Sequence, residues 1–271
     1  MPVICDDIID MMEKLAPPSL AESWDNSGLL IGRRAAGVKK ILVALDATAE
    51  VVREAVEIGA DMIVTHHPVI FKPMAQINGD TPLGEKLLTL IEQKIAVYAA
   101  HTNLDIAQGG TNDTFAESIG LTAVEPLLQT ENAVFAAIGR MGRLKTPMSL
   151  SAFAAEIKRK IGLPTIRFVG DGDRRIETAG LSTGSASNAK NFIEAQKRGC
   201  DVFITGDIRF HEAQDALALG LPLIDATHYA SENLVADKIS AYLRKELDAL
   251  KKSGITVVRS HTDGQVFQNS I

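Results

Sequence analysis

The chain has 271 residues, of which 46% are hydrophobic and 23% charged, as expected for one large or two medium-sized globular domains. No apolar run approaches the roughly 20 residues that span a bilayer, and the N-terminal residues lack a secretory signal, so we expect a cytoplasmic protein. Cys5 and Cys200 lie far apart in sequence, which argues against a disulfide framework. The net charge of −6 argues against sequence-independent nucleic-acid binding.

The first half of the chain alternates helical and strand-like patterns. Apolar residues recur at helical spacing between positions 8 and 15, and Pro17 and Pro18 end this first helix. The elements predicted after it are a strand at 41–45, a helix at 50–58, a strand at 62–65, a helix at 83–93 and a strand at 95–100. Strands that are apolar throughout, separated by helices, predict a parallel sheet covered on both faces.

The second half repeats this order. Its predicted elements are a strand at 180–182, a helix at 188–197, a strand at 202–205, a helix at 211–219 and a strand at 223–226. Residues 59–65 align with residues 199–205 through a shared glycine, aspartate and threonine. Under this internal repeat, His101 and Asp105 correspond to His228 and Glu232, so that each half would contribute one half-site and the halves would face each other.

The segments between and after these halves complete the predicted α/β fold. Residues 135–141, a helix at 150–161 and a strand at 165–170 interrupt the parallel order, and Gly170 to Asp173 predicts a hairpin turn into the next strand. A long helix from Val235 to Leu250 and a strand at 255–258 return to the first domain. We therefore expect two α/β domains, formed by residues 1–125 with 226–271 and by residues 126–225, with mostly parallel sheets covered by helices.

Histidines and carboxylates after the buried strands are the strongest functional signal. His66-His67-Pro68 follows the strand at 62–65, and His101 and His228 are each followed four residues later by a carboxylate, Asp105 or Glu232. Imidazole and carboxylate groups on loops at strand ends are typical of divalent metal sites, and this number of candidate ligands favours two ions.

Structural alternatives exist for each motif taken alone. The histidine pair would also suit two partly buried side chains bonded to the backbone, His101 to Asp105 a capped turn, and His228 to Glu232 a loop before a helix. Pro68 favours an extended His67, so the adjacent imidazoles would point to opposite sides and could bind two different ions. The recurrence of the motif at repeat-equivalent positions favours the metal site.

The charge balance of such a site favours hydrolytic chemistry. Glu232 begins the final helical region, where the helix dipole favours a carboxylate that could bridge two ions. Two divalent cations with Asp105 and Glu232 leave an excess of positive charge, which would bind hydroxide or an anionic substrate. The ligand types suit zinc, manganese, iron, nickel or cobalt and do not choose among them.

Other segments carry weaker signals. The loop from Ser23 to Gly28, with the only tryptophan, Trp24, could line the site or anchor a turn. The glycine-containing segments 109–113 and 184–188 could cradle a phosphate, although helix caps are favoured. We expect His211 near the metals without binding them and His261 in a polar tail.

Five segments together resemble the GTP cyclohydrolase I type 2 or dinuclear-metal-centre family, related to the Ngg-interacting-factor-three-like group. The resemblance covers nearly the whole chain and rests on the segments 24–28, 65–68, 101–105, 205–207 and 228–232. It implies that His67 and Asp105 bind one ion, His66 and His228 the other, and that Glu232 bridges them. It also implies a second-shell or substrate-facing role for His101.

The resemblance further implies a metal site in the cleft between two α/β domains and a ring-shaped homohexamer. It implies a metal-dependent hydrolase acting on a nucleotide such as GTP or on another phosphorylated or cyclic small molecule, with Glu232 and His101 as catalytic residues. The alternative is a non-enzymatic metal-binding or regulatory hexamer. Thr227 stands where this family more usually has glycine, and its side chain would narrow the approach to the metals.

Overall fold

Buried parallel strands form the centre of the first of two compact units in the computed structural model, which describes residues 2–129, 137–252 and 254–268. This first unit consists of Met1–Ala107 and Val235–Gly264. Its sheet has the order β1-β4-β3-β2-β11. The bounds of its elements are α1 (Cys5–Leu15), a 3₁₀ turn (Pro18–Leu20), β1 (Gly28–Ile31), β2 (Lys40–Ala44), α2 (Ala49–Ile58), β3 (Met62–Thr65), α3 (Pro82–Glu92), β4 (Ala96–Ala99), α4 (Thr102–Ile106), α10 (Leu234–Ala249, in this unit from Val235) and β11 (Thr256–Arg259).

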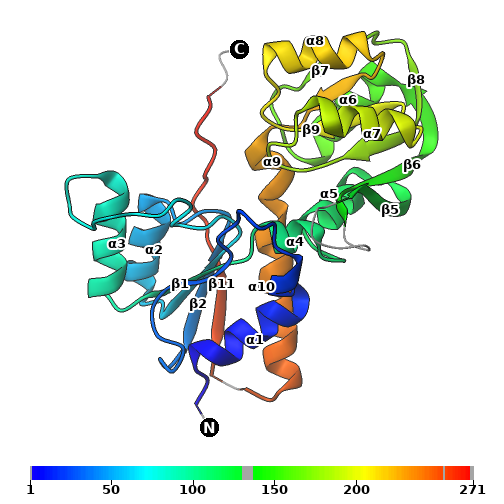
Figure 1. The fold of residues 1–271 in the computed structure, drawn as a ribbon. Coiled ribbons are helices and arrows are strands. Elements are labelled where there is room, and N and C mark those ends of the chain that lie inside the picture. The colour runs from blue at the N-terminus through cyan, green and yellow to red at the C-terminus, as the bar shows by residue number, and fades with distance from the viewer. Residues whose placement is uncertain (1, 130–136, 253, 269–271) are drawn as a thin grey trace. The chain divides into compact units, whose positions relative to one another are not determined.

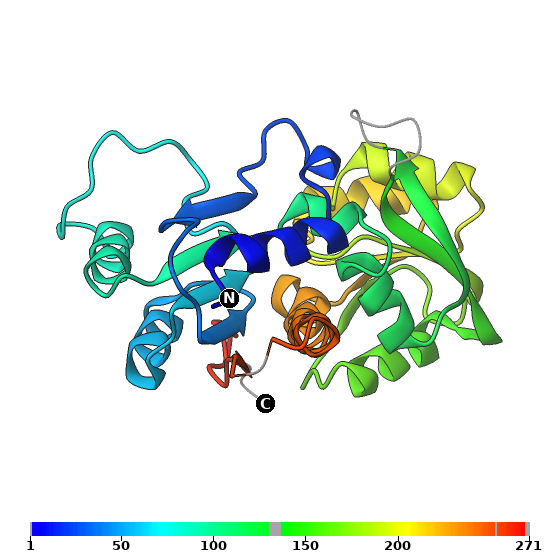
Figure 2. The same cartoon turned by 90° about the horizontal axis from the view of Figure 1, so that it is seen from below.

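Helices cover both faces of this first sheet. Every residue of β3 and β4 is buried, as expected for strands with a helix layer on each side. Figures 1 and 2 show α2 and α3 on one side of the sheet and α1 and α10 on the other. The limits of α2 are set by its caps, because Thr48 accepts a hydrogen bond from the Val51 amide at one end and Gly59 adopts a left-handed conformation at the other.

The second unit consists of Gln108–Leu234 and Gln265–Ile271. Its sheet has the order β5-β6-β8-β9-β10-β7. The bounds of its elements are α5 (Thr111–Ile119), β5 (Thr122–Gln129), β6 (Ala137–Ser149), α6 (Leu150–Lys160), β7 (Arg167–Val169), β8 (Arg175–Leu181), α7 (Ala189–Lys197), β9 (Val202–Thr205), α8 (Phe210–Ala218), β10 (Leu223–Asp225) and α9 (His228–Glu232). Of the predicted segment 135–141, residues 135 and 136 lie outside the described residues.

The two units contain the same topological motif, which confirms the internal repeat. In the first, β2, β3 and β4 are parallel neighbours linked by α2 and α3, and β1 pairs antiparallel with β4. In the second, β8, β9 and β10 are parallel neighbours linked by α7 and α8, and β7 pairs antiparallel with β10. The α/β class with helix-covered sheets is likewise confirmed.

The repeat extends to individual side chains. Asp61 Oδ2 accepts hydrogen bonds from the amides of Lys39 and Lys40, at 2.7 and 2.9 Å, at the start of β2. Its counterpart, Asp201 Oδ2, accepts from Glu177 and Thr178, both at 2.9 Å, within β8. Each aspartate thus ties the strand that it precedes to the neighbouring strand, which explains why the repeat retains this residue.

The second sheet contains more antiparallel pairs than the repeat alone requires. Three of its five strand pairs are antiparallel, because β6 lies between β5 and β8 and because β7 joins the opposite edge. The prediction of a hairpin at residues 170–173 was wrong, since β7 pairs with β10 and β8 with β6 and β9. Domain boundaries at residues 126 and 225, and a cleft between the domains, stay predictions.

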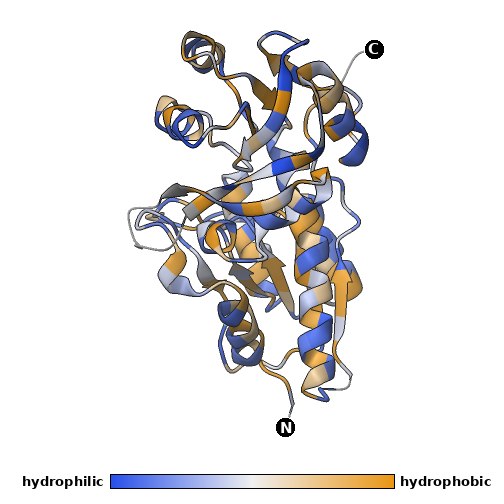
Figure 3. Cartoon of the chain, turned by 90° about the vertical axis from the view of Figure 1, so that its right-hand side faces the viewer, coloured by the Kyte–Doolittle hydropathy of each residue, from blue (hydrophilic) through white to orange (hydrophobic). Residues whose placement is uncertain are grey.

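The long helix α10 has a polar and an apolar side. Polar and apolar residues alternate along α10 (Figure 3). Its buried side includes Val235, Ile239, Leu243 and Leu247. Among the residues that the structure describes, no helix has the length and apolar content needed to cross a membrane.

Candidate metal centre

Three histidines of the first unit lie together at the carboxyl ends of adjacent parallel strands. His66 and His67 follow β3, and His101 follows β4. The ring centroids are 4.9 Å apart for His66 and His67, 5.3 Å for His66 and His101, and 5.5 Å for His67 and His101. One nitrogen of each ring lies within 4.8 Å of the others. The sequence repeat placed His101 in a half-site with Asp105, and the structure adds the spacing of the three rings.

Each of the three imidazoles is oriented through its Nδ1 atom. His66 Nδ1 lies 2.8 Å from the Ala100 carbonyl oxygen, His67 Nδ1 lies 2.9 Å from Asp46 Oδ1, and His101 Nδ1 lies 2.7 Å from Asp25 Oδ1. Because carbonyl and carboxylate oxygens accept hydrogen bonds, the proton of a neutral ring belongs on Nδ1 and Nε2 carries the lone pair. This arrangement is the one that metal-binding histidines adopt.

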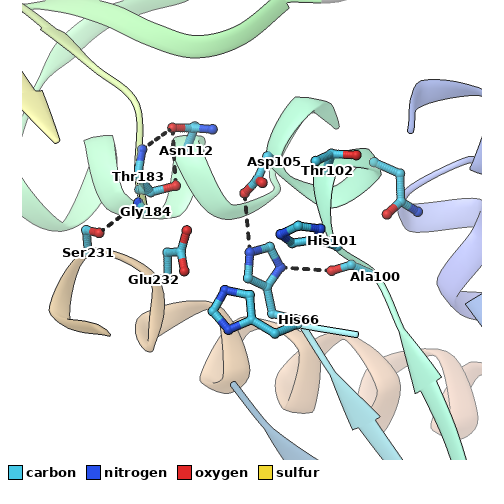
Figure 4. Close-up of polar contacts among 12 residues, drawn as sticks. His66, Ala100, His101, Thr102, Asp105, Asn112, Thr183, Gly184, Ser231 and Glu232 are labelled. Atoms are coloured by element: carbon cyan, nitrogen blue, oxygen red, sulfur yellow. Dashed lines mark hydrogen bonds and ion pairs between the residues drawn. The ribbon is translucent and has the colours of Figure 1, made fainter. Parts of the chain in front are cut away.

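Asp105 adds a carboxylate to the same cluster (Figure 4). It is 7% exposed, and its Oδ1 atom lies 3.5 Å from Nε2 of the fully buried His66. A lone pair on Nε2 facing a carboxylate oxygen is repulsive unless a proton or a cation lies between them. The ring nitrogens of His66, His67 and His101 could therefore hold a divalent cation, and the Asp105 carboxylate beside His66 offers an oxygen donor, without any thiolate.

Asp25 fixes the position of His101 through a network of hydrogen bonds. Besides His101, its carboxylate accepts hydrogen bonds from Ser27 Oγ at 2.9 Å and from Thr102 N and Oγ1 at 3.0 and 2.5 Å. Burial raises the pKa of Asp25, but the hydrogen bonds from His101 and Thr102 outweigh it, so the pKa lies well below its ordinary value. Asp25 is thus an ionised orienting group whose role the sequence reasoning missed.

In the second unit, His228 lies between two carboxylates. Its Nδ1 atom is 2.7 Å from Asp207 Oδ2, and its Nε2 atom is 3.0 Å from Glu232 Oε2. Both His228 and Glu232 belong to the short helix α9, where residues four apart share one face. The Asp207 contact repeats the orientation through Nδ1 seen in the first unit, and sequence reasoning missed it too.

Two glycines allow α9 to lie close to the strand ends beside it. A Cβ atom on Gly184 would lie 2.2 Å from Glu232 Oε1, and one on Gly206 would lie 2.5 Å from the His228 amide nitrogen. Ser231 Oγ accepts a hydrogen bond from the Gly184 amide at 3.1 Å (Figure 4). The same oxygen donates to the His228 carbonyl at 2.9 Å. The glycines are therefore required by close packing around His228 and Glu232.

The segments with weaker sequence signals have local structural roles. Asn188 Oδ1 accepts from the Asn191 amide at 3.0 Å, which confirms a helix cap at residues 184–188. Asp113 accepts from the Gly109 amide at 2.6 Å near the start of α5. His211 is exposed on α8 and contacts Gln214, and its nearness to metals stays a prediction. His261 is exposed, as expected for a polar tail, and its Nδ1 atom lies 2.7 Å from Glu54.

Thr227 lies in a strained conformation. Its φ and ψ angles are 59° and 155° at the N-cap of α9, a region that residues with a Cβ atom rarely occupy. The side chain contributes to the cap, because Thr227 Oγ1 accepts from the Ala230 amide at 3.3 Å. The backbone geometry therefore supplies a physical reason for glycine at this position.

The fold and these side chains define a class of α/β protein with a duplicated βαβαβ motif and with imidazole and carboxylate groups that could hold a metal ion. Residues 3–264 match the family model Duf34/NIF3 (NGG1p interacting factor 3), and the chain belongs to this family.

Individual relatives agree with this assignment. A protein of Clostridium perfringens named GTP cyclohydrolase 1 type 2 homolog is 38% identical over 244 residues, covering 90% of this chain and 92% of the relative. A protein of Clostridium acetobutylicum with the same name is 37% identical over 266 residues, covering 98% and 96%. The crystal structure of a Staphylococcus aureus protein covers 100% of both chains with a TM-score of 0.92 and 31% identity.

Proposed function

We propose that this protein is a metal-dependent hydrolase that holds two divalent ions through His66, His67, Asp105, His228 and Glu232. In this proposal His67 and Asp105 would hold one ion, His66 and His228 would hold the other, and Glu232 would serve both. The observation that carries the proposal is the orientation of each of these imidazoles through Nδ1, which directs the lone pair of Nε2 to a ligand. Zinc, manganese, iron, nickel and cobalt all suit this ligand set.

When bound, the ions would supply Lewis acidity and an excess of positive charge. His101 would exchange protons with the substrate through Nε2, because Asp25 occupies its Nδ1 atom at 2.7 Å. Glu232 is 4% exposed, and its carboxylate would act both as a ligand and as a catalytic group. Gly184 and Ser231 would hold the backbone around it in place.

The proposed substrate is an anionic small molecule, either a nucleotide or another phosphorylated or cyclic compound. The relatives named GTP cyclohydrolase 1 type 2 homolog make GTP the first compound to test. We further propose that the protein works in the cytoplasm as a homohexamer, as the family resemblance implies.

Turnover of GTP by metal-loaded protein tests this function. The purified protein is loaded with manganese, zinc or iron and incubated with GTP, and formate release is measured. We expect metal-dependent formate release from the wild-type protein and its loss in Glu232→Gln. The control is Glu117→Gln, which changes an exposed glutamate on α5 and should retain both metal and turnover.

Metal analysis of the same samples separates the two classes of function. Two bound ions without turnover on GTP or on a panel of other nucleotides would contradict the hydrolase and favour a metal-binding or regulatory protein. Absence of stoichiometric metal after loading would contradict both.

A further inference from the structure

Two exposed aromatic side chains form a corner on the surface of the first unit. Trp24 is 60% exposed and Phe71 is 46% exposed. Their ring centroids are 6.0 Å apart and their planes meet at 75°. We call this pair the aromatic corner. Large aromatic side chains on a surface lose the free energy that burial would provide, so a paired arrangement of this kind is typical of a binding surface.

The aromatic corner adjoins the histidine cluster through one shared ring. The His101 ring lies 6.2 Å from Trp24 at 77° and 6.1 Å from Phe71 at 87°. The same ring lies 5.3 and 5.5 Å from His66 and His67. A flat ligand on the aromatic corner would therefore lie about one side chain away from the groups that we propose bind metal.

Hydrogen bonds fix the two loops that carry the aromatic corner. Asn26 Nδ2 donates to the Ile70 carbonyl at 2.5 Å, which ties the Trp24 loop to the Phe71 loop. Asp25, next to Trp24, is bonded to His101 and to Thr102. The rings are thus held on loops that are already ordered, and a ligand would lose less free energy in organising them.

We propose that Trp24 and Phe71 form a subsite that stacks a planar heteroaromatic ring of the substrate. This inference rests on the proposed function for the reaction that follows binding. Two rings meeting at 75° can receive a flat ring against the face of one and the edge of the other, which are the two favoured aromatic geometries. The His101 ring adds a third aromatic edge, so the surroundings suit a π system better than an aliphatic chain.

Tryptophan fluorescence gives a direct test, since Trp24 is the only tryptophan in the sequence. The zinc-loaded protein is titrated with guanosine and GTP, and in parallel with ribose 5-phosphate and inorganic triphosphate. We expect guanosine and GTP to quench the emission with saturation, and the two compounds without a heteroaromatic ring to leave it unchanged. Equal responses to all four, or no response to guanosine, would overturn the proposal.

Calorimetric titration of variants separates stacking from plain hydrophobic contact. Because stacking contributes on the order of 1–3 kcal/mol per base, we expect Trp24→Ala and Phe71→Leu each to raise the Kd for guanosine about 5-fold or more, with zinc content unchanged. Phe71→Leu keeps the apolar volume and removes the ring. The control, Ile91→Ala, removes a side chain that is 50% exposed on α3 and should leave the Kd unchanged.

Three outcomes distinguish this inference from the proposed function. Guanosine binding that weakens in the variants, in a protein without turnover, would support the subsite and contradict the hydrolase. Turnover of a phosphorylated compound without a ring, together with unchanged guanosine binding in the variants, would contradict the subsite alone. A change in molecular mass by light scattering in Trp24→Ala, with guanosine affinity unchanged, would overturn the subsite in favour of contact with a second copy.

Discussion

The two copies of the βαβαβ motif share a backbone plan but differ at the ends of equivalent strands. In the first copy His66 and His67 follow β3, whereas the aligned positions after β9 are Gly206 and Asp207. The first copy therefore presents three imidazoles and Asp105, and the second presents His228 and Glu232. Where the first copy has the bulky side chain of His66, the second has Gly206, which leaves space for the start of α9. Duplication preserved the scaffold while the chemistry at the strand ends diverged.

In both copies an aspartate from a loop orients a histidine through its Nδ1 atom, but the aspartate comes from a different loop in each copy. Asp46, which orients His67, is the second residue after β2, whereas Asp207, which orients His228, is the second residue after β9. Both carboxylates lie at the carboxyl edge of their sheet, where the ends of parallel strands meet. The orientation of a histidine through Nδ1 is therefore common to both copies although the residue that achieves it is not at the same position.

The largest expected effect concerns Gly184, one of the two glycines that lie against α9 in the second copy. Gly184 has a φ of 68° and no space for a Cβ atom beside Glu232. We expect Gly184→Ala to lower the free energy of unfolding by about 3 kcal/mol, from steric overlap and from an unfavourable backbone conformation. Chemical denaturation measures this change.

Gly172→Ala is the matched control for this variant. Its added Cβ atom would lie 3.5 Å from Ser151 Cβ, an ordinary contact distance, so the change should be small. Equal stability of the two variants would show that α9 does not need the glycine, and the proposed contrast between the copies would lose its steric basis.

The next effect tests whether the two orienting carboxylates are equivalent. We expect Asp46→Asn and Asp207→Asn each to weaken metal affinity about 10- to 100-fold, as observed for groups that orient metal-binding histidines. Competition with a chelator measures the affinity. Asp248→Asn, an exposed change on α10, is the control. If only one of the two substitutions weakened metal binding, the copies would not share the orienting principle.

Much of the duplicated scaffold could be predicted from the sequence because its signals are local. Apolar runs that end at Thr65 and Thr205, after helices stopped by Gly59 and Gly199, define strand, helix and order in both copies. The edge strand β7 could not be placed, because Arg167 and Phe168 are exposed and the partner strand β10 is distant in sequence. Residues 171–174 do form a turn, but a turn does not fix which strands pair.

For the candidate site, the sequence indicated the histidines and carboxylates but not the aspartates that orient the histidines. His66, His67 and Asp105 stand out because histidines and carboxylates follow buried strands, and the structure brings these three together in the first unit. The orienting residues Asp25, Asp46 and Asp207 lie on separate loops, and each meets its histidine only once the sheet of its own unit has folded. A search for aspartates at the second position after parallel strands would have found Asp46 and Asp207.

A smaller effect concerns the first unit alone, where hydrogen bonds link the segment after β11 to Glu54 on α2. Glu54 is 4% exposed and accepts hydrogen bonds from Ser260 Oγ at 2.5 Å and Thr262 Oγ1 at 2.8 Å. Burial raises its pKa, but these hydrogen bonds and that from the His261 amide lower it more, so the pKa lies below its ordinary value of 4.5. We expect Glu54→Gln to destabilise the protein by about 1–2 kcal/mol at neutral pH.

The pH dependence of this difference follows from the direction of the shift. A carboxylate whose pKa is lower in the folded state stabilises the fold above its ordinary pKa, and the stabilisation is lost as the pH falls through the folded value. The stability difference between the wild-type protein and Glu54→Gln should therefore be full at pH 7 and shrink below pH 4.5. Denaturation at several pH values measures it, and a constant difference would contradict the role of the ionised group.

The smallest effect tests the helix starts that follow β4 and β10. His101 at the N-cap of α4 has a φ of −106°, whereas Thr227 at the N-cap of α9 has a φ of 59°. Glycine at position 227 relieves strain of order 1–3 kcal/mol, but it loses the threonine cap and adds freedom to the unfolded chain. We expect Thr227→Gly to raise stability by up to about 1 kcal/mol, seen as a higher midpoint in denaturation.

Thr227→Ala separates the two contributions. Alanine keeps the strained backbone and removes the oxygen that accepts from the Ala230 amide, so we expect it to lower stability by about 1 kcal/mol. If Thr227→Gly were as destabilising as Thr227→Ala, the cap would outweigh the strain. The second copy would then tolerate threonine because its side chain stabilises the start of α9, and the divergence between the copies would be favourable at this position.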